Sequence, residues 1–201
     1  MILALRPQLN AKSVRHHRLL MKRQTIRHAA ELDRLEALVS SAAAATVERM
    51  RDLFTKDQHL AVLALLKFTT SGCDPLNSDR PLNLVEQLNQ SFTYLASIAG
   101  ARWLLERHPT HAPFVLNLGT ASGSDIVSED GQVAAETFAA TDPDSNDKLR
   151  KDVAKVAKSA AKHKYVFFLS PIPAKRTDVP GVTVVKLDHT TLSSIPSIND
   201  A

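Results

Sequence analysis

The chain has 201 residues, of which 44% are hydrophobic and 23% charged, the proportions of an ordinary globular protein with one or two domains. Aromatic residues make up only 5%, too few for extended base-stacking surfaces, and no apolar run approaches the roughly 20 residues of a membrane-spanning helix. The single cysteine, Cys73, excludes an internal disulfide and fits a reducing compartment, so we expect a cytoplasmic location.

The formal net charge of +4 is distributed unevenly along the sequence. No acidic residue precedes Glu31, whereas the same segment contains Arg6, Lys12, Arg15, Arg18, Lys22, Arg23 and Arg27. A basic block of this kind attracts polyanions, nucleic acid above all. A solvated basic arm is the alternative interpretation. The residues predicted to bind nucleic acid are Arg15, Arg18, Lys22 and Arg23.

Apolar residues recur at three- to five-residue steps up to about residue 55, which predicts a helix over residues 12–55, and a second helix is expected over residues 57–68. The pattern suits simple core packing, and it also suits a homodimer formed through these N-terminal helices. Residues 71–81 are rich in Gly and Pro and are predicted to be a linker. We therefore divide the chain into a basic arm and helical region (1–70), this linker, and a domain from residue 82 to residue 201.

From residue 82 the pattern indicates one α/β unit. An amphipathic helix is expected over residues 82–107. Three strands should follow, over residues 114–121, 124–129 and 132–140. Asp130-Gly131, between the last two strands, is the strongest short hairpin signal in the chain. After a turn come a helix with an apolar stripe and then two strands, over residues 165–169 and 182–187.

The hairpin brings two carboxylates together. With a two-residue turn at Asp130-Gly131, Asp125 faces Glu136, and such cross-strand partners lie about 4.5–5.5 Å apart at Cβ. Two ionised carboxylates at that distance repel one another unless a cation or a shared proton compensates. A hard divalent cation, Mg²⁺ with Mn²⁺ as an alternative, resolves the repulsion. The other interpretation is an exposed pair, or one that forms a salt bridge with a lysine.

These residues resemble the PD-(D/E)XK nuclease superfamily, which includes restriction endonucleases and Holliday-junction resolvases. The shared order is helix, three-stranded meander, helix, strand, over about residues 82–188. The matching motifs are Ser124-Asp125-Ile126-Val127 and Val133-Ala134-Ala135-Glu136-Thr137-Phe138. The resemblance implies a restriction-endonuclease-like core, with Asp125 and Glu136 as Mg²⁺ ligands and the scissile phosphate against the metal. Many members also carry a glutamate on the first core helix; Glu86 is the candidate, and a solvated Glu86 is the alternative.

The chain departs from that family pattern at one position. The superfamily's lysine stands two residues after the glutamate, where this chain has Phe138. Some members take the lysine from the following helix, and Lys148 and Lys151 at the start of that helix are the candidates here. Without a lysine, the domain would bind nucleic acid without cutting it. The stripe of basic residues continues, as an expected solvated face, through Lys155, Lys158 and Lys162.

Two functions are therefore expected. The first is a metal-dependent nuclease that hydrolyses DNA phosphodiesters through a metal-activated water. The second is a catalytically inactive module that uses a nuclease-like fold for interaction or nucleic-acid binding. The eight histidines show no zinc-type ligand spacing, and His108 and His111 are expected on the surface.

Overall fold

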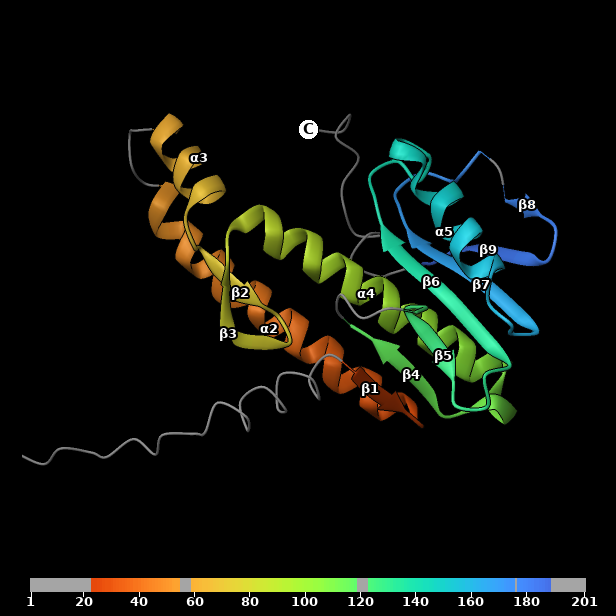
Figure 1. Ribbon diagram of the computed structural model, residues 1–201. Helices are drawn as coiled ribbons and strands as arrows, with labels where there is room; N and C mark the ends of the chain where they lie inside the picture. Colours follow the sequence, from red (N-terminus) through yellow and green to blue (C-terminus); the bar gives the residue numbers. More distant parts are fainter. Residues whose placement is uncertain (1–22, 55–58, 119–122, 176, 189–201) are drawn as a thin grey trace, which may run out of the picture.

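The computed structural model describes residues 23–54, 59–118, 123–175 and 177–188. In this part of the chain a mixed sheet has the strand order β1-β4-β5-β6-β7-β9-β8, and a small second sheet pairs β2 with β3 (Figure 1). The protein is thus of the mixed α/β class, as predicted. The strands of the large sheet are β1 (Arg23–Ile26), β4 (Phe114–Asn117), β5 (Ile126–Ser128), β6 (Val133–Ala139), β7 (His163–Leu169), β8 (Asp178–Val179) and β9 (Val182–Lys186).

The centre of the sheet changes from antiparallel to parallel pairing at β6. Strands β4, β5 and β6 form an antiparallel meander, whereas β6, β7 and β9 run parallel. Helix α5 (Lys148–Ala157) connects β6 to β7, as a parallel pair requires. Within the meander Ile126 pairs with Ala135 and Val127 with Ala134, which confirms the register predicted from the Asp130-Gly131 turn. Gly131 supplies the turn's positive φ, +70°.

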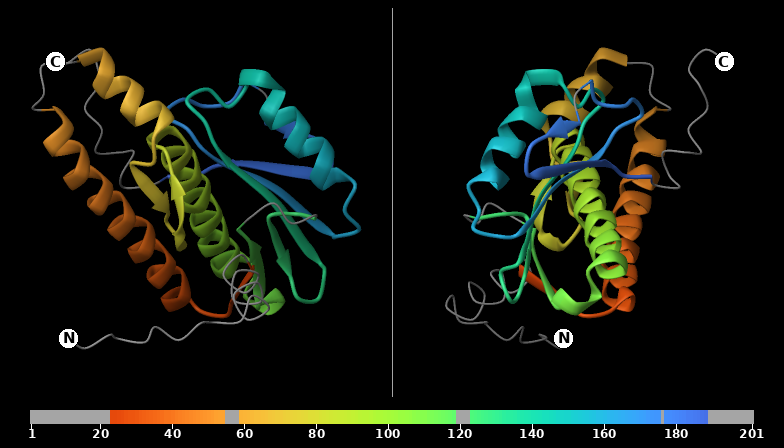
Figure 2. Two further views of the ribbon diagram at one scale, coloured as in Figure 1. Left: turned by 60° about the vertical axis from the view of Figure 1, so that its left-hand side comes forward. Right: turned by 90° about the vertical axis from the view of Figure 1, so that its right-hand side faces the viewer.

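Helices cover both faces of the sheet. Helix α4 (Leu84–Arg107) crosses one face and α5 packs on the other (Figures 1 and 2). Alternate residues of β6 divide the core: Val133 and Ala135 pack in the larger cluster with α4, whereas Ala134 and Phe138 pack in a smaller cluster with α5. Glu136 has the same parity as Ala134 and Phe138, so its side chain lies on the α5 face.

The N-terminal region shares this core instead of preceding it as a separate helix. Strand β1 pairs antiparallel with β4, so the predicted helix is wrong at residues 23–28, and residues 12–22 lie outside the described part. Buried Ile26 pairs with buried Phe114, and this burial outweighs the helical pattern. Helix α2 (Ala29–Phe54) then packs along α4, and its buried Leu32 belongs to the same apolar cluster as the sheet.

The segment predicted as a linker is a β-hairpin, β2 (Gly72–Asp74) and β3 (Asn77–Leu82). Asp74 is 2% exposed and anchors the hairpin to α4, because its carboxylate accepts a hydrogen bond from the Tyr94 hydroxyl at 3.1 Å. It also pairs with Arg80 at 3.1 Å. Turn-forming residues are common to linkers and hairpins; the buried carboxylate makes this segment part of the folded unit.

Helix α3 (His59–Phe68) extends beyond the sheet with apolar side chains in solvent, including Leu60 and Phe68, each 80% exposed (Figure 1). A homodimer through the N-terminal helices stays a prediction. None of the helices in the described ranges is long and apolar enough to cross a membrane.

Candidate active site

Asp125 and Glu136 lie side by side at the open end of the β5–β6 pair. Asp125 directly precedes β5, one register step beyond the Ile126–Ala135 pair, and so stands opposite Glu136. The backbone N–H of Thr137 donates to Asp125 Oδ2 at 2.8 Å, which fixes the carboxylate against β6. The Glu136 residue is only 1% exposed, whereas the side chain of Asp125 is 29% exposed. The hairpin thus builds a carboxylate pair with one buried and one accessible member.

A lysine of helix α5, which packs over this face of the sheet, completes the cluster. Lys155 of α5 places its Nζ 2.5 Å from Glu136 Oε2 and 3.9 Å from Asp125 Oδ1. Its side chain is half-exposed, so the ammonium group lies where the buried carboxylate meets solvent. The pair therefore faces a single positive charge that both carboxylates share.

Two carboxylate oxygens in this region lack hydrogen-bond partners. Glu136 Oε1 and Asp152 Oδ2 are buried and make no hydrogen bond within the described part of the chain. The Ser124 hydroxyl is the nearby donor, and together with Lys155 it opposes the rise in the pKa of Glu136. Buried polar atoms without partners are uncommon and indicate a missing ion, water or proton. Asp152 lies on α5 and its other oxygen accepts from Lys148 Nζ at 2.8 Å. The cluster therefore has spare acceptor capacity for a cation.

Burial, followed by the negative charge of Asp125, raises the pKa of Glu136 to about 7, although contact with Lys155 opposes the shift. Burial also raises the pKa of Asp152, and Lys148 opposes that shift. Burial alone would lower the pKa of Lys155, but its contacts with Glu136, Asp125 and Asp152 together raise it. One lysine thus offsets only part of the cost of ionising Glu136, and a divalent cation would offset more.

The α4 face supports the same site through the sheet. Ser97 Oγ of α4 and Thr137 Oγ1 are hydrogen-bonded at 2.7 Å, and both residues are buried. The Thr137 hydroxyl also donates to Asp125 Oδ2, at 3.3 Å, in addition to the hydrogen bond from the Thr137 backbone N–H. Packing between α4 and β6 therefore positions Asp125. Sequence patterns indicate no role for Ser97, nor for Thr137, although Thr137 lies within the motif that contains Glu136.

The structure differs from the sequence interpretation in the choice of lysine. Lys148 bonds Asp152 and its Nζ lies 5.5 Å from the centre of the Phe138 ring, while Lys151 bonds the carbonyl of Asn146. Neither contacts the carboxylate pair. Lys155, predicted to be a solvated residue, is the one that does. The one sequence feature that pointed toward this face is Asp152, a charged residue within the apolar stripe of α5, but it does not identify Lys155.

Glu86 does not join the pair. It occupies the third position of α4, where Asn83 Oδ1 accepts from its N–H and its own carboxylate accepts from the Asn83 N–H. It precedes Ser97, the α4 residue at the site, by 11 residues, which is about 16 Å along a helix. Glu86 therefore lies outside the carboxylate cluster, and its carboxylate caps the start of α4.

The basic residues predicted to bind nucleic acid fall mostly on undescribed segments: Arg15, Arg18 and Lys22 lie outside the described residues. Arg23 begins β1, is exposed and pairs with Asn117, whose backbone N–H donates to the carbonyl of Asp125 at 2.8 Å. Strand β4 thus lies between Arg23 and Asp125, so the two residues are two inter-strand spacings apart, or about 10 Å. The basic segment enters the sheet at the same end as the carboxylate pair.

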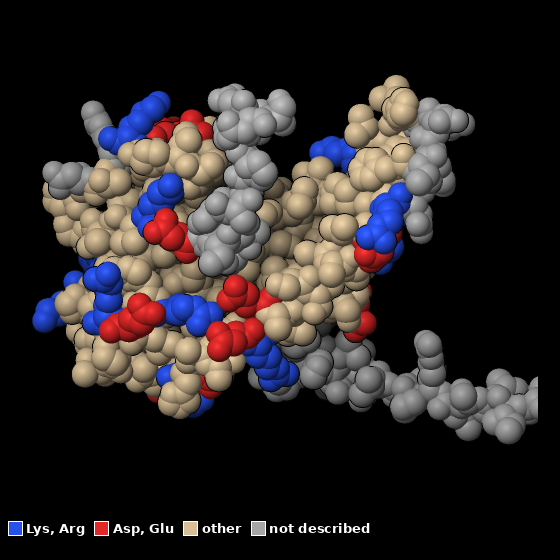
Figure 3. Space-filling model, turned by 180° about the vertical axis from the view of Figure 1, so that it is seen from behind, with Lys and Arg blue, Asp and Glu red and all other residues tan. Residues whose placement is uncertain are grey.

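The charged side chains of the described residues are of mixed sign on the side of the molecule seen from behind (Figure 3). On the face seen in Figure 3, Lys and Arg side chains are interspersed with Asp and Glu. That mixture suits a solvated surface better than a broad polyanion-binding face.

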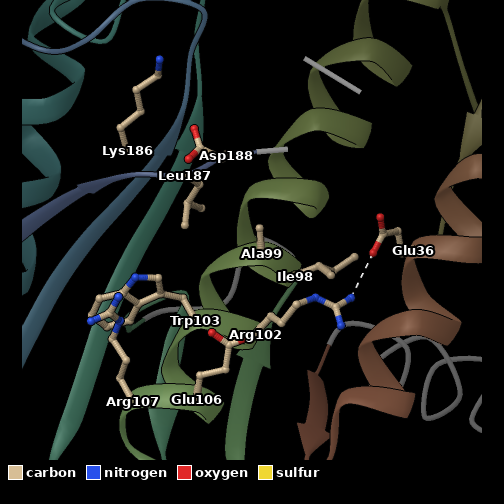
Figure 4. A pocket seen from close by; sticks show the side chains of 10 residues that line it. All are labelled: Glu36, Ile98, Ala99, Arg102, Trp103, Glu106, Arg107, Lys186, Leu187 and Asp188. Atoms are coloured by element: carbon tan, nitrogen blue, oxygen red, sulfur yellow. Dashed lines mark hydrogen bonds and ion pairs between the residues drawn. The ribbon is translucent and has the colours of Figure 1, made fainter. Parts of the chain in front are cut away.

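An open cavity of about 470 Å³ lies between α4, α2 and the end of β9 (Figure 4). Its cations already have partners: Arg102 bonds Asp33 and Glu36, and the Arg107 guanidinium stacks 4.4 Å from the Trp103 ring. Lys186 Nζ donates to the Pro171 carbonyl at 3.5 Å. The cavity borders α4, whereas Glu136 and Lys155 lie on the α5 face of the sheet. It is therefore separate from the carboxylate pair.

Comparisons with protein-family models, with curated proteins and with solved structures found no match to this chain.

Proposed function

We propose that the protein is a metal-dependent nuclease that hydrolyses DNA phosphodiesters, with Asp125 and Glu136 holding Mg²⁺ or Mn²⁺. The observation that carries the proposal is the juxtaposition of these carboxylates with Lys155 Nζ, 2.5 Å from one and 3.9 Å from the other. A buried glutamate oxygen that makes no hydrogen bond among the described residues supports a cation at the same place.

The arrangement of elements supports the proposed kinship with the PD-(D/E)XK superfamily. The chain runs α4, β4, β5, β6, α5, β7, in the order that the resemblance implies; Glu136 stands on β6 and Asp125 directly precedes β5. Lys155 supports the activity because it supplies from α5 the ammonium group that Phe138 cannot. Phe138 instead packs in the apolar cluster under α5.

The residues present fit a hard cation, because the donor set is carboxylate oxygen with one oxygen free. When bound, Mg²⁺ would supply Lewis acidity at the phosphate and a water of lowered pKa. Thr137 holds Asp125 by one oxygen and leaves Oδ1 toward the cluster. Lys155, half-exposed, can move from Glu136 to a phosphate oxygen and there stabilise developing negative charge.

The second candidate function, a catalytically inactive interaction module, is favoured by the same ion pair. Lys155 and Glu136 are in direct contact at 2.5 Å, so the carboxylate has a charge partner without any metal. A pair that serves only the fold would have this geometry, and binding of a divalent cation separates the two functions.

We expect Mg²⁺ or Mn²⁺ to bind the full chain with measurable heat in calorimetry and to raise its melting temperature. A ligand at 100 times its Kd adds about 2.7 kcal/mol to the free energy of unfolding. Supercoiled and linear DNA incubated with the protein should be cleaved with either metal and left intact in EDTA. Absence of both heat and cleavage would leave the interaction module as the function.

We expect removal of residues 1–22 to weaken DNA binding and to lower its dependence on salt. Each phosphate that the segment neutralises should contribute about 0.9 log unit of affinity per log unit of salt. The deletion must stop before Arg23, because β1 is part of the sheet. Fluorescence anisotropy at several salt concentrations measures the effect. An unchanged slope would show that the segment is a solvated arm.

A further inference from the structure

Three histidines that are far apart in the sequence converge at the hairpin end of the sheet. His108 follows the last turn of α4, His111 ends the short 3-10 helix η1 (Pro109–His111), and His163 begins β7. Each is half-buried, and one ring nitrogen from each lies within 4.8 Å of the others. Tetrahedral ligands at about 2.0–2.1 Å from Zn²⁺ are roughly 3.4 Å apart, so modest ring rotations close the difference.

We propose that His108, His111 and His163 form a binding site for a first-row transition-metal ion. Zn²⁺ is the ion that the site favours, and a water molecule takes the fourth coordination position. Neutral imidazole is the ligand type that such borderline ions prefer. His108 and His111 are partly exposed, and sequence spacing does not predict that they lie together with His163. The spacing rule failed because the third ligand, His163, comes from a strand more than fifty residues away.

Hydrogen bonds behind the rings prepare two of the histidines for a metal. His111 Nδ1 lies 2.6 Å from Asp130 Oδ2, and His108 Nε2 lies 2.6 Å from the Tyr165 hydroxyl. The Asp130 carboxylate accepts from His111 Nδ1–H, which leaves Nε2 of His111 available; Nδ1 of His108 is available in the tautomer whose Nε2 donates to Tyr165. A carboxylate behind a ligating histidine is a recurrent feature of metal sites.

Asp130 is suited to that supporting role. It accepts hydrogen bonds from the Ser128 hydroxyl at 2.6 Å and from the Gln132 N–H at 3.0 Å. These bonds, the Ser128 hydroxyl foremost and His111 next, hold the pKa of Asp130 well below its usual range, so it remains an anion.

The histidine site is distinct from the carboxylate pair. His163 stands opposite Val133 in the sheet, three residues before Glu136 on β6, which is about 10 Å along a strand. His163 has the parity of Tyr165 and Phe167, which pack toward α4, whereas Glu136 faces α5. The two sites also differ in ligand chemistry, imidazole nitrogen against carboxylate oxygen. The inference does not depend on the proposed nuclease function.

The test is titration of the full, untagged and EDTA-treated chain with Zn²⁺ by calorimetry and with Co²⁺ by visible absorbance. We expect one ion per chain and Co²⁺ bands typical of tetrahedral coordination. His163→Ala and His111→Ala should each weaken binding more than about 100-fold, and Asp130→Asn roughly 10–100-fold, as for other partners behind a ligating histidine. Affinity should also fall as the pH drops below about 6, because protons compete for imidazole.

Two controls locate the ion. His59→Ala makes the same chemical change at an exposed histidine of α3 and should leave affinity unchanged, as should Glu136→Gln at the carboxylate pair. Circular dichroism in EDTA checks that each variant is folded. If His163→Ala does not fold, the test is made with His111→Ala. The proposal is overturned if wild type binds neither ion at 100 times the protein concentration. It is also overturned if both histidine variants bind like wild type, or if Glu136→Gln alone abolishes binding.

Discussion

Replacement of Glu136 by Gln is expected to abolish Mg²⁺ binding and DNA cleavage while raising the stability of the metal-free protein at pH 8. The substitution keeps the size of a side chain that is 1% exposed and removes its charge. The proposed site loses its buried anionic ligand, so a divalent cation is held only by Asp125. Calorimetry and plasmid cleavage measure the loss, and thermal or urea unfolding measures the gain.

The pH dependence of that gain follows from the raised pKa of Glu136, about 7 in the folded protein against 4.5 for an unperturbed glutamate. Between these pH values the folded state holds the proton of Glu136 more tightly than the unfolded state does. The free energy of unfolding of the wild type therefore falls as the pH rises. Glutamine does not titrate. The variant should exceed metal-free wild type by roughly 2–3 kcal/mol at pH 8, and the difference should vanish below about pH 4.5.

The matched control for this change is Glu129→Gln, which alters an exposed carboxylate in the same hairpin. It should leave stability, Mg²⁺ binding and cleavage as in wild type. If Glu136→Gln instead unfolds more easily by about 3–5 kcal/mol, and the wild type is indifferent to Mg²⁺ and Mn²⁺, the pair is a structural salt bridge. That result would contradict the nuclease proposal.

Replacement of Lys155 by Ala is expected to slow DNA cleavage by about 10²–10³-fold while Mg²⁺ binding persists or tightens. The ammonium group that stabilises charge on the phosphate is lost. The same group competes with a divalent cation for Glu136 Oε2, so its removal frees that oxygen. A fall in cleavage rate with undiminished Mg²⁺ affinity would separate the role of Lys155 from that of the carboxylates.

The metal-free Lys155→Ala protein should lose only about 1–2 kcal/mol at pH 8, because Glu136 takes up a proton instead of remaining ionised and unpaired. In the double variant with Glu136→Gln this loss should disappear, since no buried charge is left to compensate. Lys151→Ala removes a lysine one helical turn away that contacts only the Asn146 carbonyl, and it should cleave DNA as wild type does. Equal losses in Lys151→Ala and Lys155→Ala would assign both lysines to general phosphate attraction.

The sequence alone determined the helices and strands from residue 82, apart from the short strand β8, and the register of the central hairpin. Both depend on nearby residues: periodic apolar positions define α4, α5 and the strands, and Asp130-Gly131 specifies how β5 and β6 align. Because side chains alternate along paired strands, that register alone placed Asp125 opposite Glu136.

Only the tertiary structure decided which lysine meets those carboxylates, and that His163 meets His108 and His111. The position of Lys155 depends on how α5 is rotated and shifted over β6, which packing of Leu149, Val156 and Phe138 settles, and sequence spacing does not encode that docking. The same holds for β1, whose four residues carry too short a pattern to predict a strand until Ile26 is buried against β4. Contacts between distant segments form only when the whole core packs, so the chemistry that they create is a property of the fold.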